Sequence, residues 1–346
     1  MRVLLALSGG VDSSACIPLL QQAGYDVSAC VIAFSPAHAG AVAAAQQVAQ
    51  QAGIPLTVVH REDAFDALVV QPFCREYAAG RTPNPCPMCN PLVKFRALAD
   101  EADRLGIDAI ASGHYAQVRE VDGTFYVAQA ASAARDQSYM LYRLPQDILR
   151  RLLLPAGALE KADIRAVAAQ SGFASANAPD SQEICFVPNG NYAGFIERRG
   201  VQGLPGRFIG PGGEDLGPHR GVLHYTVGQR RGIGLALGKP VFVKSILPGG
   251  DIRLAWGDGL YAAGVVLEDM LTTAGAPLPP GPYTVKIRSM AKPAPCMLSY
   301  HDAGLPTLLF DTPQRAPAPG QHAVLYQNDL VVGGGVIRTV LETIDN

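Results

Sequence analysis

The sequence lacks the features that mark membrane, secreted and strongly basic proteins. It has no run of about eighteen or more apolar residues, so we expect no membrane-spanning helix and no membrane partner. The first residues, MRVLLALSGG, have neither a long apolar core nor a signal-peptide cleavage site, so we expect the protein to be located in the reducing cytoplasm. The formal net charge is only −2, so no overall positive field indicates a polyanionic partner.

A complete disulfide framework is also excluded, because the chain has seven cysteines, an odd number. With 346 residues, 48% of them hydrophobic, the chain buries enough apolar surface to fold without disulfides. In a reducing compartment a Cys-x-x-Cys pair is more often catalytic or metal-binding than a structural bridge. Cys86 and Cys89 form such a pair. There is no second pair to complete a four-cysteine zinc site.

The pattern of apolar residues changes character near residue 198. Before it, short apolar runs alternate with helical spacing, which predicts an α/β domain with a doubly wound parallel sheet. After it, glycine and proline increase and helical spacing ends, which predicts β structure. We therefore expect three domains, at residues 1–197, 198–262 and 263–346. The expected strands include residues 3–7, 27–33, 56–60, 109–112, 241–246, 252–256, 283–290, 296–300, 306–310, 322–326 and 336–340, and the expected helices include 40–53 and 92–106.

A glycine-rich loop follows the first expected strand and opens a helix. Residues 8–14 read SGGVDSS. The two glycines allow the backbone to approach a ligand closely, and the unpaired N–H groups of a helix N-terminus attract an anion. The loop has no lysine of the kind found in P-loop NTPases. It therefore predicts a phosphate-binding loop of another class.

A second motif carries sulfur. Residues 82–90 read TPNPCPMCN, and we expect their prolines to keep the segment out of a helix. Cys89 then lies near the N-terminus of the expected helix 92–106, where the helix dipole would lower its pKa and favour the thiolate. Cys185 is a third candidate thiol. The remaining cysteines occur in apolar or helical settings and are expected to be packing residues: Cys16, Cys30, Cys74 and Cys296.

The phosphate loop resembles the PP-loop of the N-type ATP pyrophosphatases. Further segments, in the same order as in the family, narrow the resemblance to the bacterial tRNA-specific 2-thiouridylases: TPNPCPMCN, ASGHY at 111–115, DQSY at 136–139, SQEICF at 181–186 and HYTVGQRRG at 224–232. The matches extend from residue 3 to about residue 338. The resemblance implies a PP-loop catalytic domain of the adenine nucleotide alpha hydrolase type, a small central β-rich domain that binds tRNA, and a C-terminal β-barrel.

The same resemblance implies a reaction. ATP with Mg²⁺ would adenylate the 2-oxygen of the wobble uridine in tRNAs for Lys, Glu and Gln. Cys185 would carry a persulfide supplied by a sulfur-donor or sulfur-relay protein, and Cys89 would be the nucleophile or resolving thiol, forming a transient disulfide with Cys185. Asp12 would be catalytic. The implied ATP-binding residues are Ala6, Leu7, Ser8, Gly9, Gly10, Val11, Asp12, Ser13, Ile32 and Gly113. The implied contacts with the target base and tRNA are Asn84, Pro85, Cys86, His114, Arg135, Asp136, Gln137, Arg288, Ser289 and Gln321.

Several alternatives stay open at this point. Cys86, Cys89 and Cys185 also form a ligand set for a [4Fe–4S] cluster, which prefers thiolates. A second alternative is a PP-loop thiolase that acts on another RNA position. A third is a non-catalytic iron–sulfur or redox-sensing RNA-binding protein. The chain also departs from the family at residues 33–38, which lead almost directly into the next helix without the usual insertion, and at Ile32, where methionine is usual.

Arginine clusters are consistent with an RNA partner, and we expect no DNA partner. They follow the catalytic domain and include Arg198, Arg199, Arg207, Arg220, Arg230 and Arg231. Arginine suits phosphate contact and base stacking. We therefore expect tRNA binding to weaken steeply as the salt concentration rises.

Overall fold

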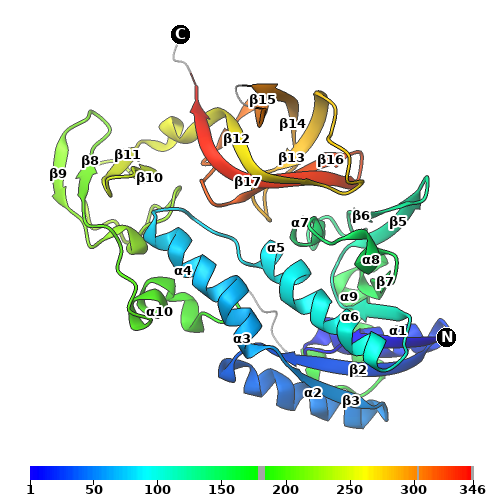
Figure 1. The fold of residues 1–346 in the computed structure, drawn as a ribbon. Coiled ribbons are helices and arrows are strands. Elements are labelled where there is room, and N and C mark those ends of the chain that lie inside the picture. The colour runs from blue at the N-terminus through cyan, green and yellow to red at the C-terminus, as the bar shows by residue number, and fades with distance from the viewer. Residues whose placement is uncertain (178–183, 302–303, 344–346) are drawn as a thin grey trace.

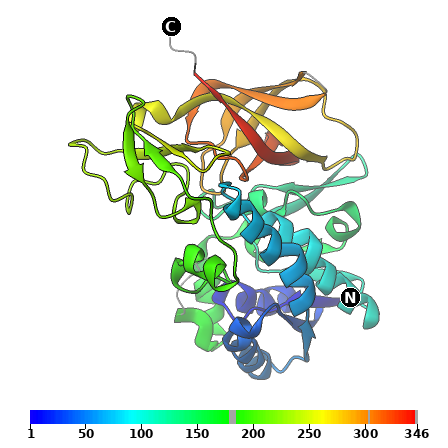
Figure 2. The same cartoon turned by 60° about the vertical axis from the view of Figure 1, so that its left-hand side comes forward.

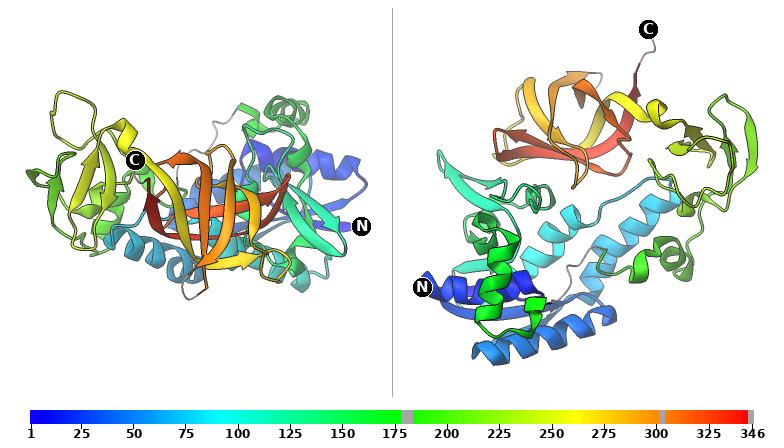
Figure 3. Two further views of the ribbon diagram at one scale, coloured as in Figure 1. Left: turned by 90° about the horizontal axis from the view of Figure 1, so that it is seen from above. Right: turned by 180° about the vertical axis from the view of Figure 1, so that it is seen from behind.

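The computed structural model describes residues 1–177, 184–301 and 304–343. The chain forms a parallel-sheet region, a central β region and a barrel, in that order along the sequence (Figure 1). The parallel sheet and the barrel lie at opposite ends of the molecule, with helices α4 to α6 between them (Figures 1 and 3). No helix within the described ranges is long and apolar enough to span a membrane.

The N-terminal region is built on a parallel sheet with strand order β3–β2–β1–β4–β7. Val3 and Leu5 point into one core and Leu4 into the other, so β1 is buried on both faces as predicted. Helices α1, α2 and α9 cover the first face, and α6 and α8 cover the second. The strands are β1 (Arg2–Ala6), β2 (Asp26–Ala33), β3 (Leu56–His60), β4 (Ala109–Ser112) and β7 (Leu152–Leu153).

The helices of this region confirm the alternating pattern. Gly53 ends α2 in the left-handed conformation, with φ 65°, which glycine adopts without strain. The α-helices are α1 (Val11–Gln22), α2 (Ala39–Ala52), α3 (Glu62–Phe65), α4 (Gln71–Ala78), α5 (Cys86–Cys89), α6 (Phe95–Arg104), α7 (Ser138–Leu141), α8 (Gln146–Leu149), α9 (Lys161–Gln170) and α10 (Tyr192–Arg198).

One local prediction is wrong: the proline-rich cysteine motif is not kept out of a helix. Cys86–Cys89 forms α5, and a π-helical turn, η3 (Asn90–Lys94), joins it to α6. Pro87 lies in the first turn, where the missing N–H has no intrahelical partner to lose. The helix therefore begins at Cys86 rather than at residue 92, and both thiols of the pair lie within it.

The central region is a small sheet with strand order β10–β11–β8–β9. The predicted strands at 241–246 and 252–256 are confirmed as β10 and β11, which pair antiparallel. Phe208, Tyr225 and Val243 are among the residues that form its core. The strands are β8 (Arg207–Ile209), β9 (Asp215–Pro218), β10 (Phe242–Ile246) and β11 (Ile252–Ala255).

The C-terminal strands close into a barrel in the order β12–β15–β14–β13–β16–β17, completed by pairing of β12 with β17. The sequence pattern did not predict β12. The predicted strand at β13 ends later than the observed one, and the predicted strand at β17 is shorter than the observed one. A hairpin from the first region also extends this sheet, because Ala128 of β6 pairs with Leu330 of β17. The strands are β5 (Gln117–Val121), β6 (Thr124–Ala128), β12 (Tyr261–Thr272), β13 (Gly281–Lys286), β14 (Ala294–His301), β15 (Leu305–Arg315), β16 (His322–Gln327) and β17 (Leu330–Glu342).

The barrel and the catalytic region share buried side chains. Val324 and Tyr326 of β16 belong to the same apolar cluster as Tyr139 and Leu141 of α7. The view in Figure 2 shows the barrel resting against the hairpin and the helices of the first region. This shared core fixes the barrel relative to the segments that surround the cysteine pair.

Candidate active site

The predicted phosphate loop connects β1 to α1 and depends on close backbone contacts. Gly9 has φ 77°, and a Cβ there would lie 2.6 Å from the Ala44 Cβ of helix α2. A Cβ at Gly113 would lie 2.8 Å from the backbone nitrogen of Ser13. Both positions therefore require glycine, and they bring α2 and the end of β4 against the start of α1.

Serine hydroxyls hold this loop in shape. The Ser8 and Ser13 Oγ atoms lie 3.0 Å apart, and Ser13 Oγ donates a hydrogen bond of 3.0 Å to the Gly10 carbonyl. Ser14 Oγ donates to the same carbonyl at 2.9 Å. The loop is therefore fixed from within, and the first N–H groups of α1 are presented to the cavity beside it.

The cavity at this loop has a volume of about 390 Å³, in the range of sites for small ligands. All the predicted ATP-binding residues line it except Gly9, whose role is to bend the loop. Three cations also line it: Lys94, Arg135 and Lys161. Cationic side chains around a helix N-terminus suit the phosphates of a nucleotide.

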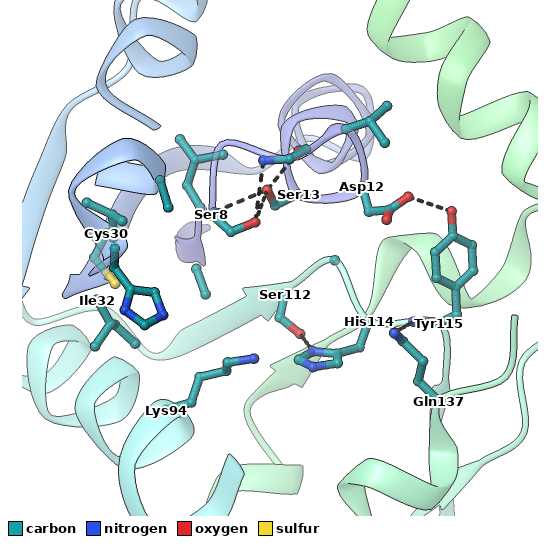
Figure 4. Close-up of a pocket in the computed structure, with 18 of the residues that line it drawn as sticks. Ser8, Asp12, Ser13, Cys30, Ile32, Lys94, Ser112, His114, Tyr115 and Gln137 are labelled. Atoms are coloured by element: carbon teal, nitrogen blue, oxygen red, sulfur yellow. Dashed lines mark hydrogen bonds between the residues drawn. The ribbon is translucent and has the colours of Figure 1, made fainter. Parts of the chain in front are cut away.

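Asp12 is held in a defined position at the edge of this cavity. Its Oδ1 accepts a hydrogen bond of 2.7 Å from the Tyr115 hydroxyl, and Lys161 Nζ lies 2.6 Å from the same oxygen (Figure 4). Asp12 is the acidic side chain among the described residues that line the cavity. One carboxylate together with substrate phosphates is a common way to bind Mg²⁺, so the site fits that ion.

Lys94 and His114 lie beside each other on the side of the cavity away from Ser8 and Ser13 (Figure 4). Ser112 Oγ lies 2.9 Å from His114 Nδ1. Burial, assisted by the Lys94 ammonium, holds the pKa of His114 well below its usual range, so the ring is neutral at physiological pH. His114 was predicted to contact the target base or tRNA; it lines the cavity at the phosphate loop, and that contact stays a prediction.

Burial affects the acidity of all three candidate thiols, and Cys89 differs from the sequence-based expectation. Burial raises the pKa of Cys89 to about 12, although the Lys94 ammonium opposes that shift. Burial likewise raises the pKa of Cys86, and desolvation raises that of Cys185, whose residue is exposed. The prediction that the helix dipole favours the Cys89 thiolate is therefore wrong, because desolvation outweighs the dipole.

The segment before Cys86 is held by the barrel. Thr82 donates its backbone N–H to the Pro319 carbonyl at 2.8 Å, and Gln321 Nε2 donates to the Thr82 carbonyl at 2.7 Å. His322 Nε2 lies 3.3 Å from the Asn84 carbonyl, and its Nδ1 lies 2.8 Å from the Tyr142 hydroxyl. Because a carbonyl only accepts, Nε2 carries the proton and Nδ1 accepts from the tyrosine.

The predicted segment Arg135–Gln137 divides between two environments. Arg135 and Gln137 line the phosphate cavity, and Gln137 Oε1 accepts a hydrogen bond of 2.9 Å from the Tyr115 backbone. Asp136 turns the other way into the protein, where its Oδ2 lies 3.0 Å from Lys286 Nζ of β13. This buried pair gives Asp136 an internal partner, and its contact with tRNA stays a prediction.

The remaining predicted tRNA contacts lie where the barrel meets its neighbours. Arg288 donates to the carbonyls of Val227 and Ala316, at 3.0 and 2.9 Å, and burial lowers its pKa. Ser289 follows it and is half-buried. Gln321 is bonded to the cysteine-motif segment as described above. These residues therefore connect the barrel to the central region and to the catalytic region. Direct contact with tRNA stays a prediction for each of them.

Comparison with known families adds independent information. A family described as tRNA methyl transferase HUP domain matches residues 1–189, its PRC-barrel domain matches 193–250, and an aminomethyltransferase beta-barrel domain matches 269–337. A protein of Lachnoclostridium phytofermentans named tRNA-specific 2-thiouridylase MnmA is 40% identical, over 97% of this chain and 99% of that protein. The chain belongs to the tRNA-specific 2-thiouridylase family. A relative of the same name from Trichlorobacter lovleyi is 39% identical over 97% of each chain.

A solved structure of a U34-tRNA thiolase NcsA from Methanococcus maripaludis with its [4Fe–4S] cluster is more distant. It is 19% identical, with a TM-score of 0.35 over 52% of this chain and 60% of that one, too low a score to support an argument about this site. Within the described ranges, no three His, Cys, Asp or Glu side chains form a group that could hold a metal ion. A [4Fe–4S] cluster held by Cys86, Cys89 and Cys185 stays a prediction.

Sequence reasoning about this thiouridylase missed several residues of the cavity. Lys161 comes from α9 and Tyr115 from the segment after β4, and both meet Asp12. Phe34 and His38, from the short connection that replaces the usual insertion, also line the cavity. Tyr115 belongs to the ASGHY motif, so the match to that motif could have indicated it. No motif indicated Lys161, because only the packing of α9 against α1 brings it to the site. Residues 181–183 of the SQEICF motif lie outside the described residues.

Proposed function

We propose that this protein is a tRNA-uridine 2-sulfurtransferase. It adenylates the wobble uridine of tRNAs for Lys, Glu and Gln with ATP and then transfers sulfur to C2, producing 2-thiouridine, AMP and pyrophosphate. The observation that carries the proposal is a nucleotide-sized cavity at the PP-loop whose wall includes Lys94, five residues after Cys89. The near full-length identity to proteins named tRNA-specific 2-thiouridylases supports the same conclusion.

The name of the matched family refers to methyl transfer. The site does not favour that chemistry. A methyl transfer needs neither a phosphate loop nor thiols. A PP-loop with surrounding cations and a nearby cysteine pair suits activation by ATP followed by nucleophilic attack of sulfur. The relatives' names agree with the second description.

In the first step, the O2 atom of the uridine forms a bond to the α-phosphorus of ATP. The bond from that phosphorus to the bridging oxygen breaks, and pyrophosphate leaves with the electron pair. The N–H groups at the start of α1 and the cations of the cavity stabilise the negative charge that moves onto the leaving phosphates. Mg²⁺, when bound with ATP near Asp12, neutralises further phosphate charge. Extrusion of the uridine from its stack is required for this contact.

In the second step, the terminal sulfur of a Cys185 persulfide attacks C2, and AMP leaves with the electrons of the C2–O bond. The Cys89 thiolate then attacks Sγ of Cys185, the persulfide S–S bond breaks, and the sulfur stays on the base. A Cys89–Cys185 disulfide remains and is reopened by a dithiol reductant. All seven cysteines are free thiols in the structure, which corresponds to the reduced enzyme.

The test is a reconstituted reaction containing purified protein, ATP with Mg²⁺, a persulfide donor, a dithiol reductant and unmodified tRNA. Nucleoside analysis by mass spectrometry should detect 2-thiouridine with the wild type. Cys185→Ser should lose the product, whereas Cys296→Ser, a change at a buried barrel cysteine, should retain it. Thiolation at another tRNA position would support the alternative of a different RNA target. Absence of any thiolated nucleoside would contradict the proposed function.

A further inference from the structure

Lys94 has no role in the reaction as described above. It is the last residue of the π-helical turn η3, which directly follows the helix that carries Cys86 and Cys89. Its half-buried side chain points into the phosphate cavity opposite the PP-loop (Figure 4). π-helical turns within helices occur frequently at functional sites. The turn therefore delivers one ammonium group from the cysteine helix to the nucleotide cavity.

Among the described residues, the Lys94 ammonium has no ion-pair partner. Lys161 pairs with Asp12 and Arg96 pairs with Asp147, whereas no carboxylate within the described ranges forms an ion pair with Lys94. A half-buried cation without a carboxylate partner favours binding of an anion that arrives from solution. The cavity it faces is the one in which the phosphates of ATP would lie.

The same charge acts on the thiols. Burial raises the pKa of each of Cys86, Cys89 and Cys185, and at all three the Lys94 ammonium is the largest opposing influence. The Lys94 backbone N–H also acts to lower the pKa of the Cys89 thiol. The other titratable or charged residues that line the cavity, within the described ranges, are Asp12, Cys30, His38, His114, Tyr115, Arg135 and Lys161.

We propose that Lys94 is a cation shared by both half-reactions of this enzyme. While ATP is bound, its ammonium contacts the phosphates near the bond that breaks, and after pyrophosphate leaves, it stabilises the thiolate that completes sulfur transfer. Lys94 stays protonated throughout, so the role requires no proton transfer. The inference rests on the proposed function and adds a specific residue to it, and it explains how burial of the thiols is compatible with their use as nucleophiles.

The first test measures the thiols without ATP or tRNA. The reduced protein is alkylated with iodoacetamide over a range of pH, and the modification of each cysteine is quantified by peptide mass spectrometry. Lys94→Met removes the charge and keeps the length of the side chain. It should slow alkylation of Cys89 and Cys185 about tenfold near pH 8, a shift of the profile by about one pH unit. Lys94→Arg should keep the wild-type profile, and so should the control Arg104→Met, at the far end of α6.

The second test measures the nucleotide step. Pyrophosphate release is followed with ATP, Mg²⁺ and tRNA in a Cys185→Ser background, in which sulfur transfer does not occur. Lys94→Met should lower the single-turnover rate constant for pyrophosphate release about tenfold or more, while Lys94→Arg should recover most of it. Arg104→Met should match the parent protein in this rate constant.

The outcomes separate the inference from the proposed function. Loss of both the thiol shift and the pyrophosphate rate in Lys94→Met, with recovery in Lys94→Arg, supports the shared role. A defect in only one readout overturns it, because Lys94 would then serve a single half-reaction. Normal values in both overturn it as well. If the wild type itself makes no 2-thiouridine, the proposed function fails, whereas the alkylation profile still reports whether Lys94 acts on the thiols.

Discussion

The buried ion pair between Asp136 and Lys286 should determine how firmly the barrel is attached to the catalytic region. Lys286 is 5% exposed and Asp136 is 8% exposed, and their charged atoms lie 3.0 Å apart. Replacing Lys286 with methionine leaves the carboxylate buried without its counter-charge. Breaking such a pair by removing one partner typically costs about 3–5 kcal/mol of unfolding free energy.

The structure places the expected cost toward the lower end of that range. Asp136 also accepts hydrogen bonds from the Ser138 hydroxyl at 2.9 Å and from the backbone N–H groups of Ala130 and Ser138 at 3.1 and 3.2 Å. These donors still stabilise the carboxylate after the ammonium is gone, so we expect a loss of about 3 kcal/mol for Lys286→Met. The double variant with Asp136→Asn should cost less than the sum of the single changes, because it leaves no buried charge unpaired.

Urea unfolding followed by two signals provides the assay. Circular dichroism reports on the helices, which lie mostly in the catalytic region, and fluorescence reports on Trp256, the single tryptophan, in the central region. The control is Lys244→Met, which breaks an exposed pair with Glu342 and should cost less than about 1 kcal/mol. A Lys286→Met protein no less stable than this control would refute the reasoning. Because Arg135 and Gln137 flank Asp136 and line the cavity, Lys286→Met should also raise the KM for ATP.

Two further predictions concern the phosphate loop and pH. Gly9→Ala should weaken ATP binding at least about tenfold in equilibrium titrations, because its Cβ meets Ala44, whereas Gly24→Ala, at φ 85° with open space around it, should leave binding unchanged. Burial and the nearby Arg143 lower the pKa of His322 to about 3, so folding stability is fully present above pH 6.5 and falls as the pH drops toward 3. Between pH 6.5 and 5, urea unfolding should show wild type losing about 2 kcal/mol more than His322→Gln; equal losses would contradict this.

Local patterns predicted the parts of the site that are contiguous in the chain. The SGGVDSS loop, its preceding strand and its helix follow from residue order, because two glycines and an apolar run specify a strand–turn–helix unit without distant contacts. The parallel sheet likewise follows from the alternation of strands and helices. The apolar or helical setting of each cysteine in the sequence correctly predicted which are packing residues. Cys16, Cys30, Cys74 and Cys296 are buried, and the three candidate thiols are less buried.

Chain order alone did not indicate the direction in which a side chain points or how far it is desolvated. Arg135 and Gln137 reach the nucleotide cavity and Asp136 reaches Lys286 because the barrel packs against that segment. The acidity of Cys89 was mispredicted for the same reason, since a helix N-terminus is visible in sequence and burial is not.

The sequence by itself determined the family, the phosphate loop, the thiol set and the succession of one α/β region and two β regions, because each depends on residues close together in the chain. Only the tertiary structure decided that Lys161 and Tyr115 hold Asp12, that the barrel holds the segment before Cys86, and that Lys94 lines the cavity at the phosphate loop. These features depend on charge, burial and distance between residues far apart in sequence, and such quantities exist only once the chain is packed.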